Sequence, residues 1–153
     1  MPVTQIESIA QLAEYVGREV GTSDWLDVSQ ERINQFAEVT EDRQWIHIDV
    51  ERAARESPFK ETIAHGFLSL SLLSVLGKSA ISVGDVRTGI NYGLNRVRFV
   101  APVPAGARIR GRFTLAMLEE IKGGVQATWN VTVERAGGDK PCCVAQWLVR
   151  YYE

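Results

Sequence analysis

Apolar residues along the first part of the chain recur at the three- and four-residue spacing of a helix. They are Ile6, Ile9, Leu12, Ala13, Val16 and Val20. This spacing predicts an amphipathic helix, and Gly21 directly after it is a typical C-terminal stop. A short extended segment is expected next, through Trp25, Leu26 and Val28.

Two further helices are indicated by residues that favour helix N-termini. Ser29 precedes a segment with one apolar face, and this helix should end at Thr40. Asp49 is expected to cap one more short helix, which should stop before Ser57 and Pro58 because proline disfavours helical geometry in the residue before it.

The segment 66–80 is apolar on nearly every side of a predicted helix. Leucines and one valine are interleaved with three serines, and no charge occurs before Lys78. A strand is the alternative, but the length of the segment and its lack of β-branched residues favour a helix. A helix of this composition should be buried.

The last third of the chain alternates between apolar and polar residues, which is the period of a β-strand. The alternation is clearest from Val125 to Val133, and glycine-rich turns at 122–124 and 137–139 separate the segments. We expect strands over 88–100, 107–121, 124–136 and 141–152. An antiparallel meander of these strands, curved around one buried helix, is an α+β architecture.

The composition indicates a single domain over residues 1–153. The chain is 45% hydrophobic and 24% charged, long enough for one well-filled core and too short for two ordinary domains. Its net charge of −2 gives no basic field for nucleic acid or an anionic membrane. There is no apolar span of transmembrane length and no signal-peptide pattern, so we expect a cytoplasmic protein.

Cys142 and Cys143 are the only cysteines. Neighbouring residues of a strand point to opposite faces, so these two are poorly placed to bridge each other. They lack metal-ligand spacing, and the chain has only two histidines, so no metal site is expected. We interpret them as small core or surface residues.

Asp42 and His47 are the first candidates for chemistry. They lie five residues apart in a loop that directly follows a predicted helix. A carboxylate and an imidazole that converge can hold one water molecule and move its protons near neutral pH. In the alternative, Asp42 is a solvated helix-end residue and His47 a half-buried residue with its hydrogen bonds satisfied.

The step from His65 to Gly66 lies where the apolar helix begins. Backbone N–H groups at a helix N-terminus are unpaired, and Gly66 has no side chain to block a ligand, so its N–H could face a carbonyl oxygen. In the alternative, Gly66 only allows close packing and His65 bonds locally. Ser74, two turns further along, is a candidate for the same site, although a serine within a helix often bonds its own backbone.

Three motifs in the same order resemble the MaoC-like (R)-specific enoyl-CoA hydratases. The first is Glu41–Asp49 (EDRQWIHID), and the second is Ile63–Leu68 (IAHGFL). The third comprises Asn91–Phe99 and Pro102–Gly106, which resemble the NodN-like branch of that family. The resemblance spans nearly the whole chain.

The resemblance implies a homodimeric hot-dog enzyme that hydrates trans-2-enoyl thioesters to 3-hydroxyacyl thioesters. The catalytic Asp and His of the family correspond to Asp42 and His47. Its oxyanion-binding N–H corresponds to Gly66, and its active-site serine to Ser74. Gly66 would polarise the thioester carbonyl while the Asp–His pair adds water at C3 and a proton reaches C2.

The implied substrate is carried by coenzyme A or by the pantetheine of a carrier protein, and no metal or redox cofactor is required. Arg96 and Arg98 are candidates for phosphate contacts, although arginines on a strand are often solvated. One departure from the family is Gln44-Trp45, where Asn-Pro is usual. We expect the larger Trp45 to narrow or reshape the acyl pocket.

Two alternatives stay open from the sequence. Hot-dog domains also support thioesterases, although the spacing of Asp42 and His47 argues against hydrolysis. A catalytically silent acyl-binding dimer is the other alternative, because a fold alone does not establish activity.

Overall fold

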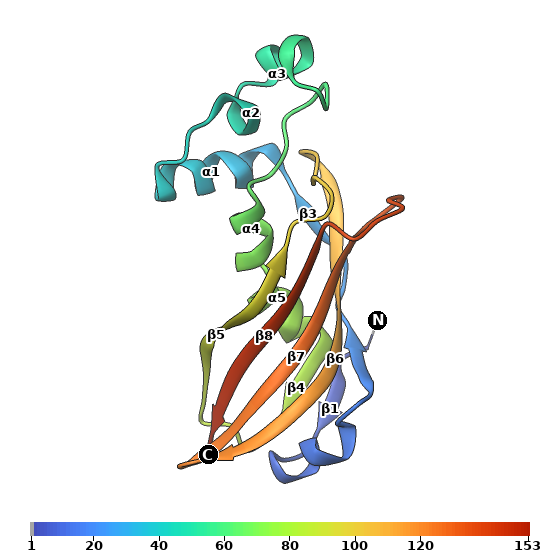
Figure 1. Cartoon of the computed structure of the whole chain (residues 1–153), viewed down its shortest axis with the longest axis vertical. Coiled ribbons are helices and arrows are strands. Elements are labelled where there is room, and N and C mark those ends of the chain that lie inside the picture. Colours follow the sequence, from blue (N-terminus) through green and yellow to red (C-terminus); the bar gives the residue numbers. More distant parts are fainter. Residues whose placement is uncertain (1) are drawn as a thin grey trace.

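The computed structural model describes residues 2–153. Its elements are, in chain order, β1 (Thr4–Ile6), the 3₁₀ helix η1 (Ala10–Tyr15), β2 (Glu19–Thr22), β3 (Leu26–Val28), α1 (Gln30–Thr40), α2 (Trp45–Ile48), α3 (Val50–Glu56), α4 (Gly66–Ser71), α5 (Leu73–Ala80), β4 (Ile81–Val83), β5 (Thr88–Arg98), β6 (Ala107–Ile121), β7 (Gly124–Arg135) and β8 (Cys143–Tyr152). The main sheet has six strands in the order β2–β6–β7–β8–β5, with β3 also paired to β6. Helices α4 and α5 lie against this sheet, and α1 to α3 lie beyond one end of it (Figure 1). The predicted α+β class is confirmed.

The predicted N-terminal helix is wrong. Residues 6–20 form the end of β1, the short η1 and part of β2 instead. β1 pairs in parallel with β4, and β2 pairs with β6, so long-range pairing overrides the helical spacing. Gly21 is a strand residue and not a helix stop: a Cβ there would lie 2.6 Å from the backbone oxygen of Ala80, so only glycine allows this close approach.

The caps predicted for α1 and α3 are confirmed. The side chain of Ser29 accepts a hydrogen bond from the N–H of Arg32, and the side chain of Asp49 accepts one from the N–H of Arg52. α1 ends at Thr40, as expected, and Glu41 follows with a left-handed φ of 62°. This residue turns the chain toward α2, a short helix that the sequence pattern did not reveal.

The apolar segment 66–80 is helical, as predicted, but it is broken at Leu72 into α4 and α5. Leucines on one side of both helices are buried against the sheet. The expectation of burial on nearly every side is wrong for the other side, where Phe67 is 68% and Val75 is 44% exposed. One face of this helix pair is therefore available to another molecule.

All four strands predicted in the last third of the chain are present, but they do not form one meander. β6, β7 and β8 pair consecutively, whereas β5 pairs with β8 at the far edge. β5 does not pair with β6, because β2 and β3 occupy that side of β6. β5 thereby becomes an edge strand of the main sheet.

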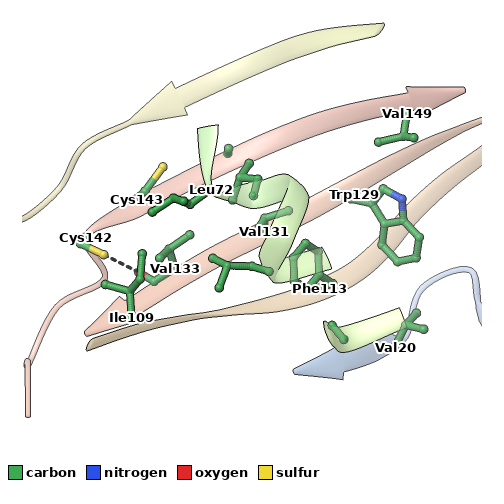
Figure 2. Close-up of a cluster of buried hydrophobic side chains, with 14 of the residues drawn as sticks. Val20, Leu72, Ile109, Phe113, Trp129, Val131, Val133, Cys142, Cys143 and Val149 are labelled. Carbon is green, nitrogen blue, oxygen red and sulfur yellow. Dashed lines mark hydrogen bonds between the residues drawn. The ribbon is translucent and has the colours of Figure 1, made fainter. Parts of the chain in front are cut away.

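The core lies between α4–α5 and the sheet (Figure 2). Phe113 and Trp129 meet there edge to face, with 6.4 Å between ring centroids. Cys142 and Cys143 are both buried and free, so of the two places expected for them, core or surface, both lie in the core. Burial raises the pKa of each thiol to about 11. Among residues 2–153, no helix has both the length and the apolar character needed to cross a bilayer.

Candidate active site

A pocket of about 430 Å³ lies where the segment after α3, the start of α4 and residues 99–103 meet. His47 and Gly66 both line it. Phe59 and Phe99, which are both partly exposed, also line it. The structure thus brings two of the residues singled out from the sequence into one cavity.

His47 is held in a defined tautomer by the backbone. Its Nδ1 lies 2.7 Å from the carbonyl oxygen of Ile63, and because a carbonyl only accepts, Nδ1 carries the hydrogen. The lone pair is therefore on Nε2. Burial lowers the pKa of His47 below its usual 6.5, and this outweighs the opposing effects of the Ile63 hydrogen bond and of Asp42. The ring is neutral at pH 7 and able to accept a proton.

Gln30 in α1 positions the segment that carries His47, and sequence reasoning missed it. Its Nε2 donates to the backbone oxygen of His47 at 2.7 Å. Its Oε1 accepts from the hydroxyl of Thr62 at 2.5 Å. One side chain thus connects α1, α2 and the chain that leads to Gly66. A glutamine in the first turn of a helix carries no sequence signal for this role.

Asp42 lies in the exposed loop between α1 and α2. A carboxylate oxygen of Asp42, a ring nitrogen of His47 and a ring nitrogen of His65 all lie within 4.8 Å of one another. The structure therefore brings Asp42 and His47 close together, as the spacing suggested. Because the carboxylate is open to solvent and the ring is not, the pair lies at the boundary between pocket and water.

His65 joins this pair, although the sequence analysis gave it only local hydrogen bonding. It is 2% exposed, and its ring stacks on that of His47 with 3.8 Å between centroids and 23° between planes. Its Nε2 donates to the backbone oxygen of Asp42 at 2.9 Å. Among the side chains of residues 2–153, its Nδ1 is the one buried polar atom without a hydrogen-bond partner, which costs about 1–3 kcal/mol.

Asp42, His47 and His65 have the composition of a metal-binding set but not the geometry. Nδ1 of His47 and Nε2 of His65 are already bonded to backbone carbonyls. The remaining lone pairs lie in the planes of two stacked rings, so they do not both aim at one ion, as tetrahedral coordination requires. The arrangement suits a hydrogen-bonded water molecule better than a metal.

Gly66 is the first residue of α4, so its N–H has no helical partner four residues earlier. The face of Phe99 packs directly on it: a Cβ on Gly66 would lie 2.7 to 2.9 Å from atoms of that ring. Both functions considered for Gly66, an accessible N–H and close packing, are therefore compatible with its position. The glycine allows Phe99 to lie beside the pocket.

Ser74 and Trp45 lie apart from this pocket. Ser74 is exposed on α5 and lines a second cavity of about 240 Å³, together with Asn91 and Trp147. The structure of one chain does not bring Ser74 to His47. The expectation that Trp45 reshapes the pocket is not met, because Trp45 is absent from its lining and packs 4.2 Å under the guanidinium of Arg52.

Comparison with known proteins gives a consistent set of relatives. The model of the MaoC like domain matches residues 11–136. 3-Hydroxyacyl-thioester dehydratase Z of Mycobacterium tuberculosis is 52% identical over 146 residues, which are 95% of this chain and 96% of that protein. Nodulation protein N of Rhizobium meliloti is 46% identical over 143 residues, 92% of this chain and 89% of that protein. The structure of an unliganded R-hydratase from Pseudomonas aeruginosa matches with a TM-score of 0.72 and 27% identity, over 95% of this chain and 86% of that one.

The fold and these relatives define a hot-dog protein of the hydratase and dehydratase class. Enzymes of this class are carbon–oxygen lyases. The chain belongs to the MaoC-like domain family, in the branch that includes nodulation protein N. The family resemblance drawn from the sequence motifs is thus confirmed. The individual roles of Asp42, His47, Gly66 and Ser74 stay predictions.

Proposed function

We propose that this chain catalyses the (R)-specific hydration of trans-2-enoyl thioesters and the reverse dehydration of 3-hydroxyacyl thioesters. The observation that carries the proposal is the approach of the Asp42 carboxylate to the His47 ring, within 4.8 Å, beside the pocket that Gly66 lines. The substrate class is supported by the relative that is 52% identical, whose name specifies 3-hydroxyacyl thioesters.

In the proposed reaction, Asp42 and His47 hold one water molecule. As the new C3–O bond forms, one O–H bond of the water breaks and its proton passes to the pair. The pair delivers a proton to C2, where the electrons of the former double bond form the new C–H bond. The neutral state and free Nε2 of His47 support its part as the acceptor.

The thioester carbonyl is proposed to lie at the start of α4. There the N–H of Gly66 can donate to the oxygen, which withdraws electrons from the conjugated double bond and favours attack at C3. Coenzyme A or a carrier-protein pantetheine serves as the handle of the substrate in this proposal, and no metal or redox cofactor takes part. Ser74 is proposed to contact the acyl group, from its place in the neighbouring cavity.

The proposal includes a homodimer joined through β5. This edge strand and the loop after it expose large apolar side chains: Ile90, Tyr92, Leu94, Phe99 and Val100. An unpaired sheet edge with apolar side chains is a usual protein–protein surface. Light scattering at micromolar concentration should give a mass near twice 17.0 kDa. A fully active monomer would contradict this part of the proposal.

The decisive experiment incubates the purified protein with crotonyl-CoA. The proposal predicts loss of the enoyl absorbance without release of free thiol, and chiral analysis should find the (R)-3-hydroxy product. Release of thiol would indicate a thioesterase instead. No change in either signal across a panel of enoyl-CoA chain lengths would indicate a non-catalytic acyl-binding protein.

A further inference from the structure

His65 contacts the other groups of the candidate site. Its Nε2 lies 2.9 Å from the backbone oxygen of Asp42, its ring stacks on His47, and it directly precedes Gly66 in the chain. We propose that this histidine is a positioning residue, which holds the side chains of Asp42 and His47 in a fixed place relative to the backbone N–H of Gly66. The inference rests on the proposed hydratase function and adds a residue to it.

The first contact fixes the loop that carries Asp42. A carbonyl oxygen only accepts, so Nε2 of His65 carries the hydrogen and donates it. The backbone N–H of Asp42 makes only a long contact of 3.4 Å, with the hydroxyl of Thr40. The hydrogen bond from His65 spans 23 residues of sequence and ties this exposed loop to the N-terminus of α4.

The second contact fixes the ring of His47. His65 is itself immobilised, because it is 2% exposed and Phe36 packs on it with 4.9 Å between ring centroids. The His47 ring stacks on this fixed ring, which sets the plane in which its Nε2 lone pair lies. Both halves of the Asp–His pair are therefore oriented by one side chain, whose next residue is the proposed oxyanion donor.

The two stacked imidazoles are also coupled electrostatically. The titratable groups around His47 are Asp42 from the loop after α1, His65 at the start of α4, and Cys142 before β8, which lines the same pocket. The pKa of the Cys142 thiol is raised to about 11 by burial, so this thiol is uncharged near neutral pH. Besides burial, a positive charge on His65 lowers the pKa of His47, and Asp42 opposes this.

Two variants separate the contacts of His65. His65→Gln keeps an N–H donor at about the reach of Nε2, and His65→Phe keeps a flat ring without a donor. We expect His65→Phe to lower kcat by about 10- to 100-fold with little change in KM, because a catalytic group misplaced by about 1 Å can lower the rate by about 100-fold. His65→Gln should lower kcat less than His65→Phe, because it keeps the hydrogen bond to Asp42 and loses only the stacking on His47. If His65→Phe does not fold, His65→Asn replaces it, because its shorter amide cannot reach the Asp42 carbonyl.

A control variant measures how far lost stability alone affects turnover. Leu12→Ala removes a side chain that is 0% exposed in η1, away from the site. It should lower the melting temperature and leave kcat per folded molecule unchanged. If His65→Phe or its substitute His65→Asn behaves like Leu12→Ala, His65 is only structural and the proposal is wrong. If His65→Gln loses as much activity as His47→Ala, His65 itself takes part in proton transfer and the positioning role is also wrong.

NMR titration supplies a readout that does not depend on activity. The chain has only two histidines, so the imidazole signals are assigned directly from a variant that lacks one of them. The pKa of His47 should rise in His65→Gln, because a neighbour that can carry positive charge is removed. An unchanged His47 pKa would count against the coupling. A protein that shows the pKa shift but hydrates no enoyl thioester would disprove the proposed function and leave the contact itself intact.

Discussion

The segment that carries the candidate site and the sheet with its central helices are stabilised in different ways. Within residues 29–65, which we call the site segment, Ile33 is the one large apolar side chain among the buried residues. The sheet core, by contrast, buries large apolar side chains from neighbouring strands: Leu115, and also Phe113, Trp129, Val131 and Val133, which are labelled in Figure 2.

The site segment depends on hydrogen bonds between side chains and backbone. Gln30 bonds the backbone of His47, Ile63 accepts from the His47 ring, and His65 bonds the backbone of Asp42. Hydrogen bonds are directional, whereas burial of apolar surface is not. Substitutions in the site segment should therefore change catalysis, and substitutions in the sheet core should mainly change stability.

The largest expected effect comes from the Asp–His pair. Asp42→Ala and His47→Ala should each lower the rate of hydration by about two to four orders of magnitude, the range for a positioned acid or base. Asp42 is exposed, so its variant should also keep the melting temperature of the wild type. The double variant should lose little more than either single one, because both residues serve one water molecule. Near-normal activity in either folded variant would remove the pair from the mechanism.

Gly66→Val should suppress turnover by about 10- to 100-fold, because a side chain there crowds the oxyanion position and displaces Phe99. Gly66→Ala should do less, since a single Cβ meets only the ring of a partly exposed side chain that can shift. Turnover and melting temperature are measured on the same sample. Unchanged turnover per folded Gly66→Val molecule, with a lower melting temperature, would show that Gly66 serves only packing.

Leu115→Ala tests the sheet core, the second of the two regions compared. Leu115 is 0% exposed in β6, and its truncation should lower the free energy of unfolding by about 2–5 kcal/mol. Hydration per folded molecule should stay at the wild-type level, because no group of the site changes. Denaturant unfolding and crotonyl-CoA assays at a temperature where the variant is folded give both values. A large loss of turnover here would mean that the two regions are more tightly coupled than their contacts suggest.

Gln30→Leu should affect both properties moderately. It leaves the backbone oxygen of His47 and the hydroxyl of Thr62 without their partner, at a cost of about 1–3 kcal/mol in stability. A decrease in kcat of about tenfold is expected, as α2 loses one of its anchors. Asn34→Ala is the matched control, since it removes only the hydrogen bond from Gln30 Nε2 to Asn34 and keeps the groups that bond to His47 and Thr62. The two variants should differ clearly in kcat, and equal values would argue against anchoring by Gln30.

The smallest effect is a pH dependence of stability. The pKa of His47 is lower in the folded protein than the usual 6.5, mainly because the ring is buried. Below about pH 6.5 the unfolded chain therefore binds more protons than the folded one. The free energy of unfolding should decrease as the pH is lowered from about 6.5 to the pKa of folded His47. The slope from this one group is at most about 1.4 kcal/mol per pH unit. His47→Gln should flatten the curve in this range, and an unchanged slope would refute the assignment.

Local features of the fold were readable from the sequence. Ser29 and Asp49 cap helices as predicted, because capping is a contact between a side chain and a backbone N–H a few residues away. The strands of the last third were found because alternation repeats within each strand. The N-terminal helix was predicted wrongly, since the pairings of β1 with β4 and of β2 with β6 depend on residues far along the chain.

By itself, the sequence determined the fold class, the family and the spacing that lets Asp42 meet His47. Only the tertiary structure showed that His65 stacks on His47, that Phe99 covers Gly66, and that Ser74 lies in a different cavity. The physical reason is the range of the interactions. Periodicity and caps act over a few residues, whereas packing of the site joins segments that the sequence separates by tens of residues, and their partners are chosen by the fold as a whole.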